Sequence, residues 1–141
     1  MPIYRFIDAA LTRLSLSAGY SLMSVSSDLL VQSSCQACRA DAPLLTSEEL
    51  AALLPHIPEW TLIQQDGVQQ LKRVYRFSNF IEPLNFARQL GEMAEKEDHH
   101  PSILLEWGQL TVRWWSHKIK GLHRNDVIMA AKTEAAFGKL P

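Results

Sequence analysis

The amino-acid sequence predicts an α+β fold, in which a four-stranded antiparallel sheet is covered on one face by three helices. Two stretches of strand-like residues, each divided by a glycine-containing turn, indicate two hairpins. Three capped or amphipathic stretches indicate helices, and the elements follow one another in the order αββαββα. Elements of this kind bury their apolar faces by packing as a helical layer against a sheet.

The first helix and the first hairpin are marked by their end residues. Thr46-Ser-Glu-Glu49 is a capping box ahead of a leucine-rich stretch, which predicts a short helix that stops near Pro55. The following segments 60–65 and 68–77 flank the dipeptide Asp66-Gly67. Because both residues tolerate positive φ, the dipeptide favours a type I′ turn and a tight hairpin.

The second and third helices are predicted from caps and periodicity. Asn79 can cap the second helix, and Pro83 is suited to its first turn. Its apolar stripe recurs at three- and four-residue spacing and comprises Leu84, Ala87, Leu90, Met93 and Ala94. Gly121 breaks the chain ahead of the third helix, which we expect over residues 124–137.

The second hairpin is expected over residues 102–107 and 110–116, with a turn at Gly108-Gln109. A two-residue turn with Gly first, the type II′ arrangement, pairs residue 107 with 110 and brings His100 opposite His117. This register turns one apolar set toward the helices: Ile103, Leu105, Trp107, Leu110, Val112 and Trp114. The opposite face, which carries the two histidines, is polar and suits a flat polar ring: His100, Ser102, Leu104, Glu106, Thr111, Arg113, Trp115 and His117.

Length and composition exclude several classes of protein. The 141 residues are enough for one domain, and 47% hydrophobic residues are enough for a buried core. The formal net charge is -1, so there is no broad cationic field for nucleic acid or an acidic membrane surface. No apolar run approaches the ~20 residues of a membrane span. We therefore expect neither nucleic acid nor a membrane as a partner.

The N-terminal part of the chain differs from the rest. Residues 1 to about 43 lack a sustained period. We expect residues 1–34 to form a poorly ordered or accessory extension, with Met23 as a second possible start, ahead of a domain over residues 35–141. No continuous apolar core of a signal peptide is present, which favours a cytoplasmic location. Cys35 and Cys38 form a Cys-x-x-Cys pair, which is half of a zinc site. A reduced pair in a loop is the favoured interpretation.

Four of the five histidines gather within 25 residues: His99, His100, His117 and His123. Imidazoles change protonation near neutral pH, so such a cluster can supply a general acid and a general base at once. Glu95 precedes His99 by four residues and could orient it from the same helix face. Asp126 lies in the first turn of the third helix, where it acts either as a dipole-complementing acid or as a site residue.

A metal site is the alternative interpretation of this cluster, because three histidines and an aspartate could bind zinc or iron. The sequence contains no compact histidine pair of the His-Glu-x-x-His type. We therefore favour acid–base catalysis and expect no metal and no organic cofactor.

The same residues carry a resemblance to a known family. Glu95-Lys-Glu-Asp-His99-His100-Pro101, followed by Trp107, His117 and Asp126, resembles the signature of the pterin-4a-carbinolamine dehydratases, also known as dimerisation cofactors of a homeodomain transcription factor. The segment 111–126 looks like the bacterial branch associated with phenylalanine hydroxylase. The similarity extends over residues 35–136. One departure is Asn125, which stands where the family often has arginine, with Arg124 one position earlier.

The resemblance implies an activity and a site. The activity is dehydration of 4a-hydroxytetrahydrobiopterin to quinonoid dihydropterin, within tetrahydropterin recycling for aromatic amino acid hydroxylation. One of His99 and His117 would protonate the departing 4a-hydroxyl, while another histidine assists loss of the N5 proton. His100 would hold and polarise the pterin, and Glu95 and Asp126 would orient the histidines. The substrate-binding residues implied are Trp60, Pro101, Ser102, Trp115, Ser116 and Lys118.

The resemblance also bears on partners. It implies a homodimer or homotetramer and an aromatic amino acid hydroxylase as a possible partner. The family's second role is non-enzymatic, as a protein-binding or transcriptional regulatory cofactor, and this is the alternative function.

Overall fold

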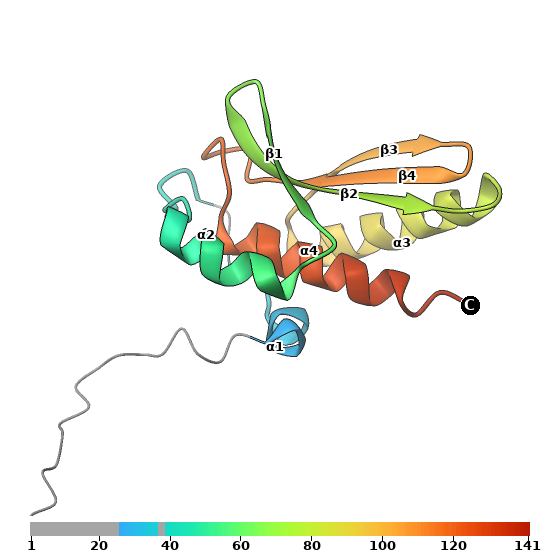
Figure 1. Ribbon diagram of the computed structural model, residues 1–141, viewed down its shortest axis with the longest axis horizontal. Helices are drawn as coiled ribbons and strands as arrows, with labels where there is room; N and C mark the ends of the chain where they lie inside the picture. Colours follow the sequence, from blue (N-terminus) through green and yellow to red (C-terminus); the bar gives the residue numbers. More distant parts are fainter. Residues whose placement is uncertain (1–25, 37–38) are drawn as a thin grey trace, which may run out of the picture.

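The computed structural model describes residues 26–36 and 39–141, so the expectations for residues 1–25 and for Cys38 lie outside the described residues. The elements, in chain order, are α1 (Ser27–Gln32), α2 (Ser47–Leu53), the 3-10 helix η2 (Leu54–His56), β1 (Thr61–Gln65), β2 (Val68–Arg76), α3 (Ile81–Glu97), β3 (Ser102–Glu106), β4 (Gln109–Trp114) and α4 (Arg124–Phe137). The strands form one antiparallel sheet in the order β1-β2-β4-β3, and the helices lie beneath one face of it (Figure 1). The predicted fold class is confirmed.

The first helix and hairpin form as their signals predict. At the start of α2, Thr46 accepts a hydrogen bond from the Glu49 N–H and the Glu49 carboxylate accepts one from the Thr46 N–H. The turn between β1 and β2 consists of Asp66 and Gly67, with φ of 52° and 77°. Both turn residues are in the left-handed region, as a type I′ turn requires.

The core lies between the sheet and the two long helices. The predicted third helix and α4 have the same bounds, and α3 turns its stripe of Pro83, Phe86, Leu90 and Ala94 inward. Leu84, which the spacing places on that stripe, is exposed instead. An aromatic cluster closes the core at one end and comprises Tyr75, Phe77, Phe86 and Phe137. Burial of these side chains is the main term that stabilises the fold.

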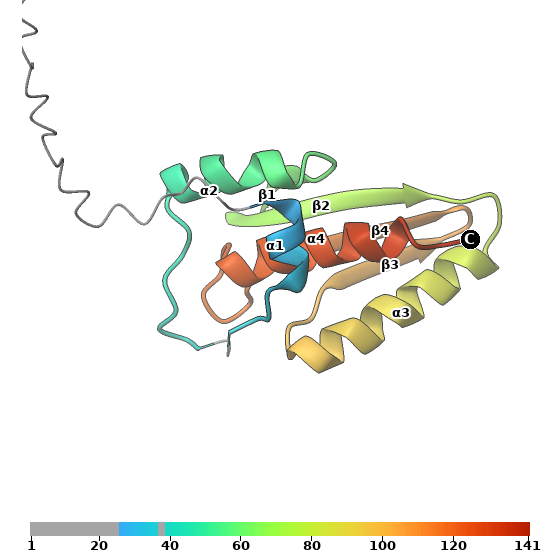
Figure 2. The ribbon, with the colours of Figure 1, turned by 90° about the horizontal axis from the view of Figure 1, so that it is seen from below.

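Helix α1 is an element that the sequence pattern did not predict. It is six residues long, begins after the N-cap Ser26, and lies against α4 on the side away from the sheet (Figures 1 and 2). Its Leu30 is fully buried in the core. Helices this short are marginal in isolation, so tertiary packing rather than local periodicity stabilises α1.

The β3–β4 hairpin has a register different from the predicted one. Leu105 pairs with Leu110 and Glu106 with Gln109, so the turn consists of Trp107 and Gly108. Gly108 has a φ of 69°, and a Cβ there would lie 3.0 Å from the carbonyl oxygen of Phe77. Glycine is therefore required at the second turn position rather than the first.

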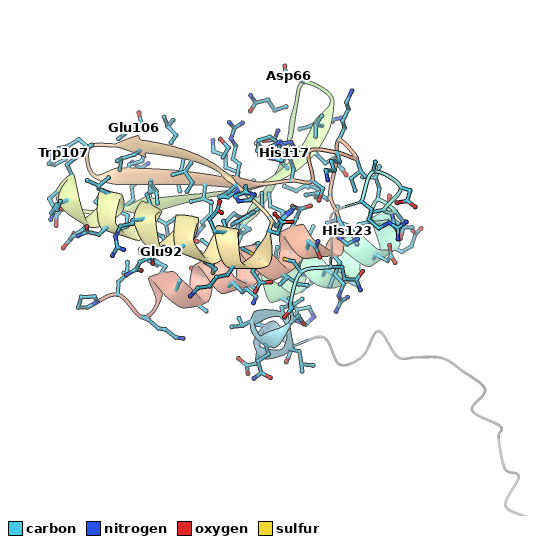
Figure 3. All side chains as sticks on the ribbon, turned by 180° about the vertical axis from the view of Figure 1, so that it is seen from behind. Asp66, Glu92, Glu106, Trp107, His117 and His123 are labelled. Atoms are coloured by element: carbon cyan, nitrogen blue, oxygen red, sulfur yellow. The ribbon has the colours of Figure 1, made fainter. Side chains whose placement is uncertain are left out.

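Two expectations fail with that register. Trp107, expected in the core, is 73% exposed at the tip of the hairpin, at the opposite end of the sheet from His117 (Figure 3). His100 is not opposite His117, because the pairing is displaced by two residues. A displacement of two leaves the faces unchanged, so Leu110, Val112 and Trp114 are buried as predicted.

Candidate active site

The two adjacent histidines diverge because α3 ends just before them. The helix ends at Glu97, and Asp98 adopts a left-handed backbone with a φ of 49°. The His99 N–H then bonds back to the carbonyl oxygen of Ala94 at 3.1 Å. This helix end turns the His99 side chain into the molecule, where it is 4% exposed, and leaves that of His100 half-exposed.

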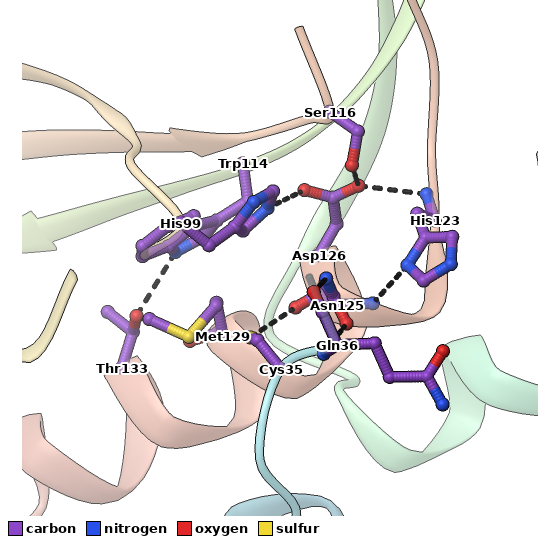
Figure 4. A network of polar contacts seen from close by, with 10 residues as sticks. All are labelled: Cys35, Gln36, His99, Trp114, Ser116, His123, Asn125, Asp126, Met129 and Thr133. Carbon is purple, nitrogen blue, oxygen red and sulfur yellow. Dashed lines mark hydrogen bonds and ion pairs between the residues drawn. The ribbon is translucent and has the colours of Figure 1, made fainter. Parts of the chain in front are cut away.

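His99 belongs to a buried network centred on Asp126 (Figure 4). Its Nε2 lies 2.6 Å from Oδ1 of Asp126, a carboxylate with no solvent exposure in the first turn of α4. The other oxygen, Oδ2, accepts hydrogen bonds from the Ser116 hydroxyl at 2.9 Å and from the His123 backbone N–H at 2.8 Å. A carboxylate only accepts hydrogen bonds, so His99 donates from Nε2 and its tautomer is fixed. Three donors compensate the burial of this charge.

The second ring nitrogen of His99 faces the surface. Trp114 stacks on the ring, with centroids 5.6 Å apart and planes inclined by 13°. Among the residues that the structure describes, the only buried side-chain nitrogen or oxygen without a hydrogen-bond partner is Nε1 of Trp60. Nδ1 of His99 also has no partner in this part of the chain, so it must be accessible. Asp126 thus fixes the His99 ring through Nε2, and Nδ1 is left available to a ligand.

His100, rather than His99, is the partner of Glu95. Nε2 of His100 lies 2.7 Å from Oε1 of Glu95, and both side chains are largely exposed. The expectation that Glu95 orients His99 is therefore wrong. The four-residue spacing applies only within a helix, and the left-handed Asp98 ends the helix before His99.

His117 lies on the open face of the sheet, beyond the end of β4. It begins the turn 117–120, which is closed by the backbone hydrogen bonds between Ser116 and Gly121 at 2.8 and 3.4 Å. Its ring centroid lies 4.2 Å from that of Trp115. If the β3–β4 register continues beyond its last pair, Trp115 falls opposite His100. Trp115 therefore lies beside His117 and, in the continued register, opposite His100.

The remaining predicted substrate-binding residues occupy different places. Pro101 is half-buried between His100 and β3, and Lys118 is exposed beside His117. Ser102 accepts a hydrogen bond from Arg113, whereas Ser116 is buried and donates to Asp126.

Trp60 is not brought to the histidine cluster. It packs in the core with its ring edge toward Tyr75, at a centroid distance of 6.5 Å. It also lines a cavity of about 290 Å³ with residues of α1, η2 and α4, and none of the clustered histidines belongs to that lining.

An N-terminal segment is tied to the same network. Asn125, which is buried, donates from Nδ2 to the Gln36 carbonyl at 2.7 Å and accepts from the Gln36 N–H at 3.0 Å. The Cys35 N–H donates to Glu97 at 2.9 Å, and Lys132 also binds Glu97, at 2.5 Å. We call Cys35 and Gln36 the strap. The departure of Asn125 from the family pattern was the only signal of this contact in the sequence.

The contacts of the strap shift the pKa of two groups, the Glu97 carboxyl and the Cys35 thiol. The hydrogen bond from the Cys35 N–H, reinforced by Lys132, lowers the pKa of Glu97. Burial, and secondarily the nearby Glu97 carboxylate, raise the pKa of the Cys35 thiol to about 12. Cys35 is therefore a neutral thiol near neutral pH.

No membrane or metal feature accompanies this site. In the described ranges 26–36 and 39–141, no group of three or more His, Cys, Asp or Glu side chains is arranged to hold a metal ion. No helix within the same ranges is long and apolar enough to span a bilayer.

Comparison with known proteins identifies the family. Residues 43–136 match the model of the family described as pterin 4 alpha carbinolamine dehydratase. The chain belongs to this family. It is 56% identical over 106 residues to a protein of Syntrophotalea carbinolica with the provisional name pterin-4-alpha-carbinolamine dehydratase, which covers 75% of this chain and 95% of that protein. A protein of Marinobacter nauticus with the same provisional name is 56% identical over 108 residues, with 77% of this chain and 97% of that one covered.

A solved structure gives the same result. The crystal structure of a transcriptional coactivator/pterin dehydratase from Brucella melitensis matches with a TM-score of 0.60 and 29% identity, over 67% of this chain and 98% of that chain. The protein is thus a pterin-4a-carbinolamine dehydratase, a hydro-lyase, and the family match contains the whole histidine network. The strap and α1 lie before the matched segment.

Proposed function

We propose that this protein dehydrates 4a-hydroxytetrahydrobiopterin to quinonoid dihydropterin by histidine acid–base catalysis. The observation that supports it most directly is the placement of His99. Asp126 holds Nε2, Nδ1 is open, and His117 and His100 lie at the surface beyond the adjacent strand ends. A carboxylate that fixes the tautomer of a catalytic imidazole is a recurrent arrangement in acid–base catalysis.

The reaction defines what the site must supply. The bond from C4a to its hydroxyl oxygen breaks, and the hydroxyl takes up a proton and leaves as water. N5 loses its proton, and its electron pair forms the new double bond to C4a. One proton is donated and one is accepted, so the site needs an acid and a base but no oxidant or reductant.

The histidines divide these tasks. His99 and His117 are the acid and base in this proposal, because Nδ1 of the buried His99 has no hydrogen-bond partner among the described residues and the His117 side chain is exposed. His100, bound to Glu95 on the exposed face, holds and polarises the pterin. The product is then available for reduction, which would restore the tetrahydropterin consumed by an aromatic amino acid hydroxylase.

Formation of quinonoid dihydropterin from freshly generated carbinolamine, followed by absorbance in metal-free buffer, tests the proposal. We expect wild-type protein to accelerate the reaction and His117→Ala to lose ~100-fold or more of that acceleration, the range for a general acid or base. A wild-type rate equal to the uncatalysed rate would overturn the proposal. Metal analysis of the same sample tests zinc, because near-stoichiometric zinc required for turnover would favour the metal alternative.

The regulatory alternative is favoured by one observation, the name of the Brucella melitensis structure, which includes transcriptional coactivator. The variant His100→Ala with His117→Ala separates the two functions. If the protein is a catalyst, the wild type shows turnover and the variant loses it. If it is only a binding protein, the wild type shows no turnover and the variant still binds its partner.

A further inference from the structure

Arg113 lies on the open sheet face near the end of β4, the end that leads to His117. One residue from each strand forms a cross-strand row here: Thr61, Lys72, Arg113 and Ser102. The helices lie on the other face of the sheet, so the Arg113 side chain is not covered by a helix (Figure 1). Neither the histidine cluster nor the acid–base chemistry above uses this side chain.

Neutral groups hold the guanidinium in place. Nη1 of Arg113 donates to the side-chain oxygens of Gln65 and of Gln70, the latter at 3.2 Å. Nη2 donates to the Ser102 hydroxyl at 3.2 Å, and the guanidinium carbon lies 5.6 Å above the Trp115 ring. These contacts orient a planar group that would otherwise sample many rotamers.

The charge of Arg113 is uncompensated. No carboxylate forms an ion pair with it among the described residues. Its partner across the strand is Lys72, and like charges directly opposite in a sheet are destabilising. The cation therefore has no anionic partner within the described residues, and an acceptor on a ligand could pair with it.

The guanidinium also has donors to spare. It carries five N–H groups, and three of them bind Gln65, Gln70 and Ser102. The Nε–H and one Nη2–H have no acceptor in the described part of the chain. Such a pair of N–H groups is suited to a carbonyl or oxyanion acceptor.

We propose that Arg113 binds the carbonyl oxygen O4 of the pterin ring, an inference that rests on the proposed function. O4 is borne by the carbon next to C4a, so a guanidinium that holds it also fixes the carbon from which the hydroxyl leaves. The Trp115 ring lies between the Arg113 guanidinium and the His117 ring and is in contact with both. Ser102, which accepts a hydrogen bond from Arg113, follows His100 in the chain with only Pro101 between them. Arg113 thus determines specificity for pterins with an oxygen at position 4.

The test is a binding experiment without turnover. Calorimetry gives the Kd of 7,8-dihydrobiopterin and of the corresponding 2,4-diamino compound, in which an amino donor replaces O4. We expect wild type to bind the 4-oxo compound ~10-fold or more tightly than the 4-amino compound, since a charge-assisted hydrogen bond is lost. In Arg113→Gln the two constants should agree within about 2-fold. In turnover, the variant should raise KM and change kcat by less than ~3-fold.

Arg76→Gln is the matched control. Arg76 is on the same sheet face, four residues along β2 from Lys72, and its guanidinium also binds a neutral side chain, that of Gln109. It should keep the wild-type preference. Arg113→Lys, which retains the charge without the planar fork, should show an intermediate preference and serves if Arg113→Gln does not fold.

The outcomes separate this inference from the proposed function. Wild-type binding and turnover with an unchanged preference in Arg113→Gln would overturn the role of Arg113 alone, as would a wild type that binds both compounds equally. A wild type that neither binds dihydrobiopterin nor accelerates dehydration would overturn the proposed function as well.

Discussion

The histidines of this protein occupy two regions with opposite physical character. In the buried network, His99 is 4% exposed and Asp126 fully buried, and each oxygen of Asp126 has at least one donor. In the open-face cluster, His100 and His117 are exposed, and the partner of His100 is a largely solvated carboxylate.

The difference shows how one site combines fixed and adaptable groups. A hydrogen bond in a low-dielectric interior is strong and expensive to leave unmade, so the buried network holds one proton position. An exposed ion pair contributes little, because solvent screens it and side-chain entropy opposes it. The open-face side chains can therefore adjust to a ligand, while His99 cannot.

The largest effect should follow removal of the buried charge. Asp126→Asn places an amide where Ser116, His123 and His99 all donate, so at least one donor meets an N–H group. We expect turnover to fall by about 100-fold or more. The free energy of unfolding should fall by roughly 3 kcal/mol, the range for removal of one partner of a buried charged pair. Stopped-flow turnover and urea denaturation measure the two effects.

Glu95→Gln is the comparison for that variant, because it removes the carboxylate of the exposed pair and leaves a similar shape. We expect less than a 3-fold change in turnover and no measurable change in stability. Equal losses in Asp126→Asn and Glu95→Gln would contradict the distinction between the two regions.

The open sheet face and the buried network also differ in how far the sequence predicts them, and the open face depends on the turns of the two hairpins. The Asp66-Gly67 turn was predictable because few dipeptides accept positive φ at both positions. The β3–β4 turn was not, because alternation has a period of two and a displacement by two residues preserves every face. The pattern therefore identified the open face correctly and mispaired His100 with His117 on it.

The sequence predicted which residues belong to the buried network but not which of them are in contact. His99 and Asp126 stood out as a clustered histidine and a helix-terminal acid. Their contact depends on the left-handed Asp98, which turns His99 inward, and non-glycine residues adopt that conformation too rarely to be foreseen. Arg113 was missed because its neutral partners on β1, β2 and β3 become neighbours only in the folded sheet.

A smaller effect should follow when the strap is released. Asn125→Ala removes both hydrogen bonds to the Gln36 backbone and leaves those backbone groups without partners in a part-buried position. We expect a loss of about 2 kcal/mol in the free energy of unfolding. Turnover should fall by less than in Asp126→Asn. Gln36→Ala keeps the backbone groups and should be neutral, and an equal loss in that control would show that side-chain packing, not the amide pairing, holds the strap.

A still smaller effect concerns the thiol of the strap. In a Cys38→Ser background, Cys35 is the sole thiol, and its pKa of about 12 means that the reactive thiolate is scarce at neutral pH. The rate of alkylation by iodoacetamide should keep rising about tenfold per pH unit from pH 7 to 10. Glu97→Gln removes the neighbouring negative charge, so the pKa should fall and the rate at pH 8 should increase. A plateau near pH 9 would show an ordinary, solvated thiol.

The smallest effect should come from the N-terminal extension. Protein that begins at Met23 keeps Ser26, the N-cap of α1, and every contact of Leu30 and the strap described above. We expect its turnover and its urea midpoint to match those of the full chain. Protein that begins at Cys35 loses Leu30 from the core, and that change alone should cost about 2 to 3 kcal/mol of stability. A substantial loss of turnover on removal of residues 1–22 would mean that the extension supports the site, and the accessory role proposed for it would be wrong.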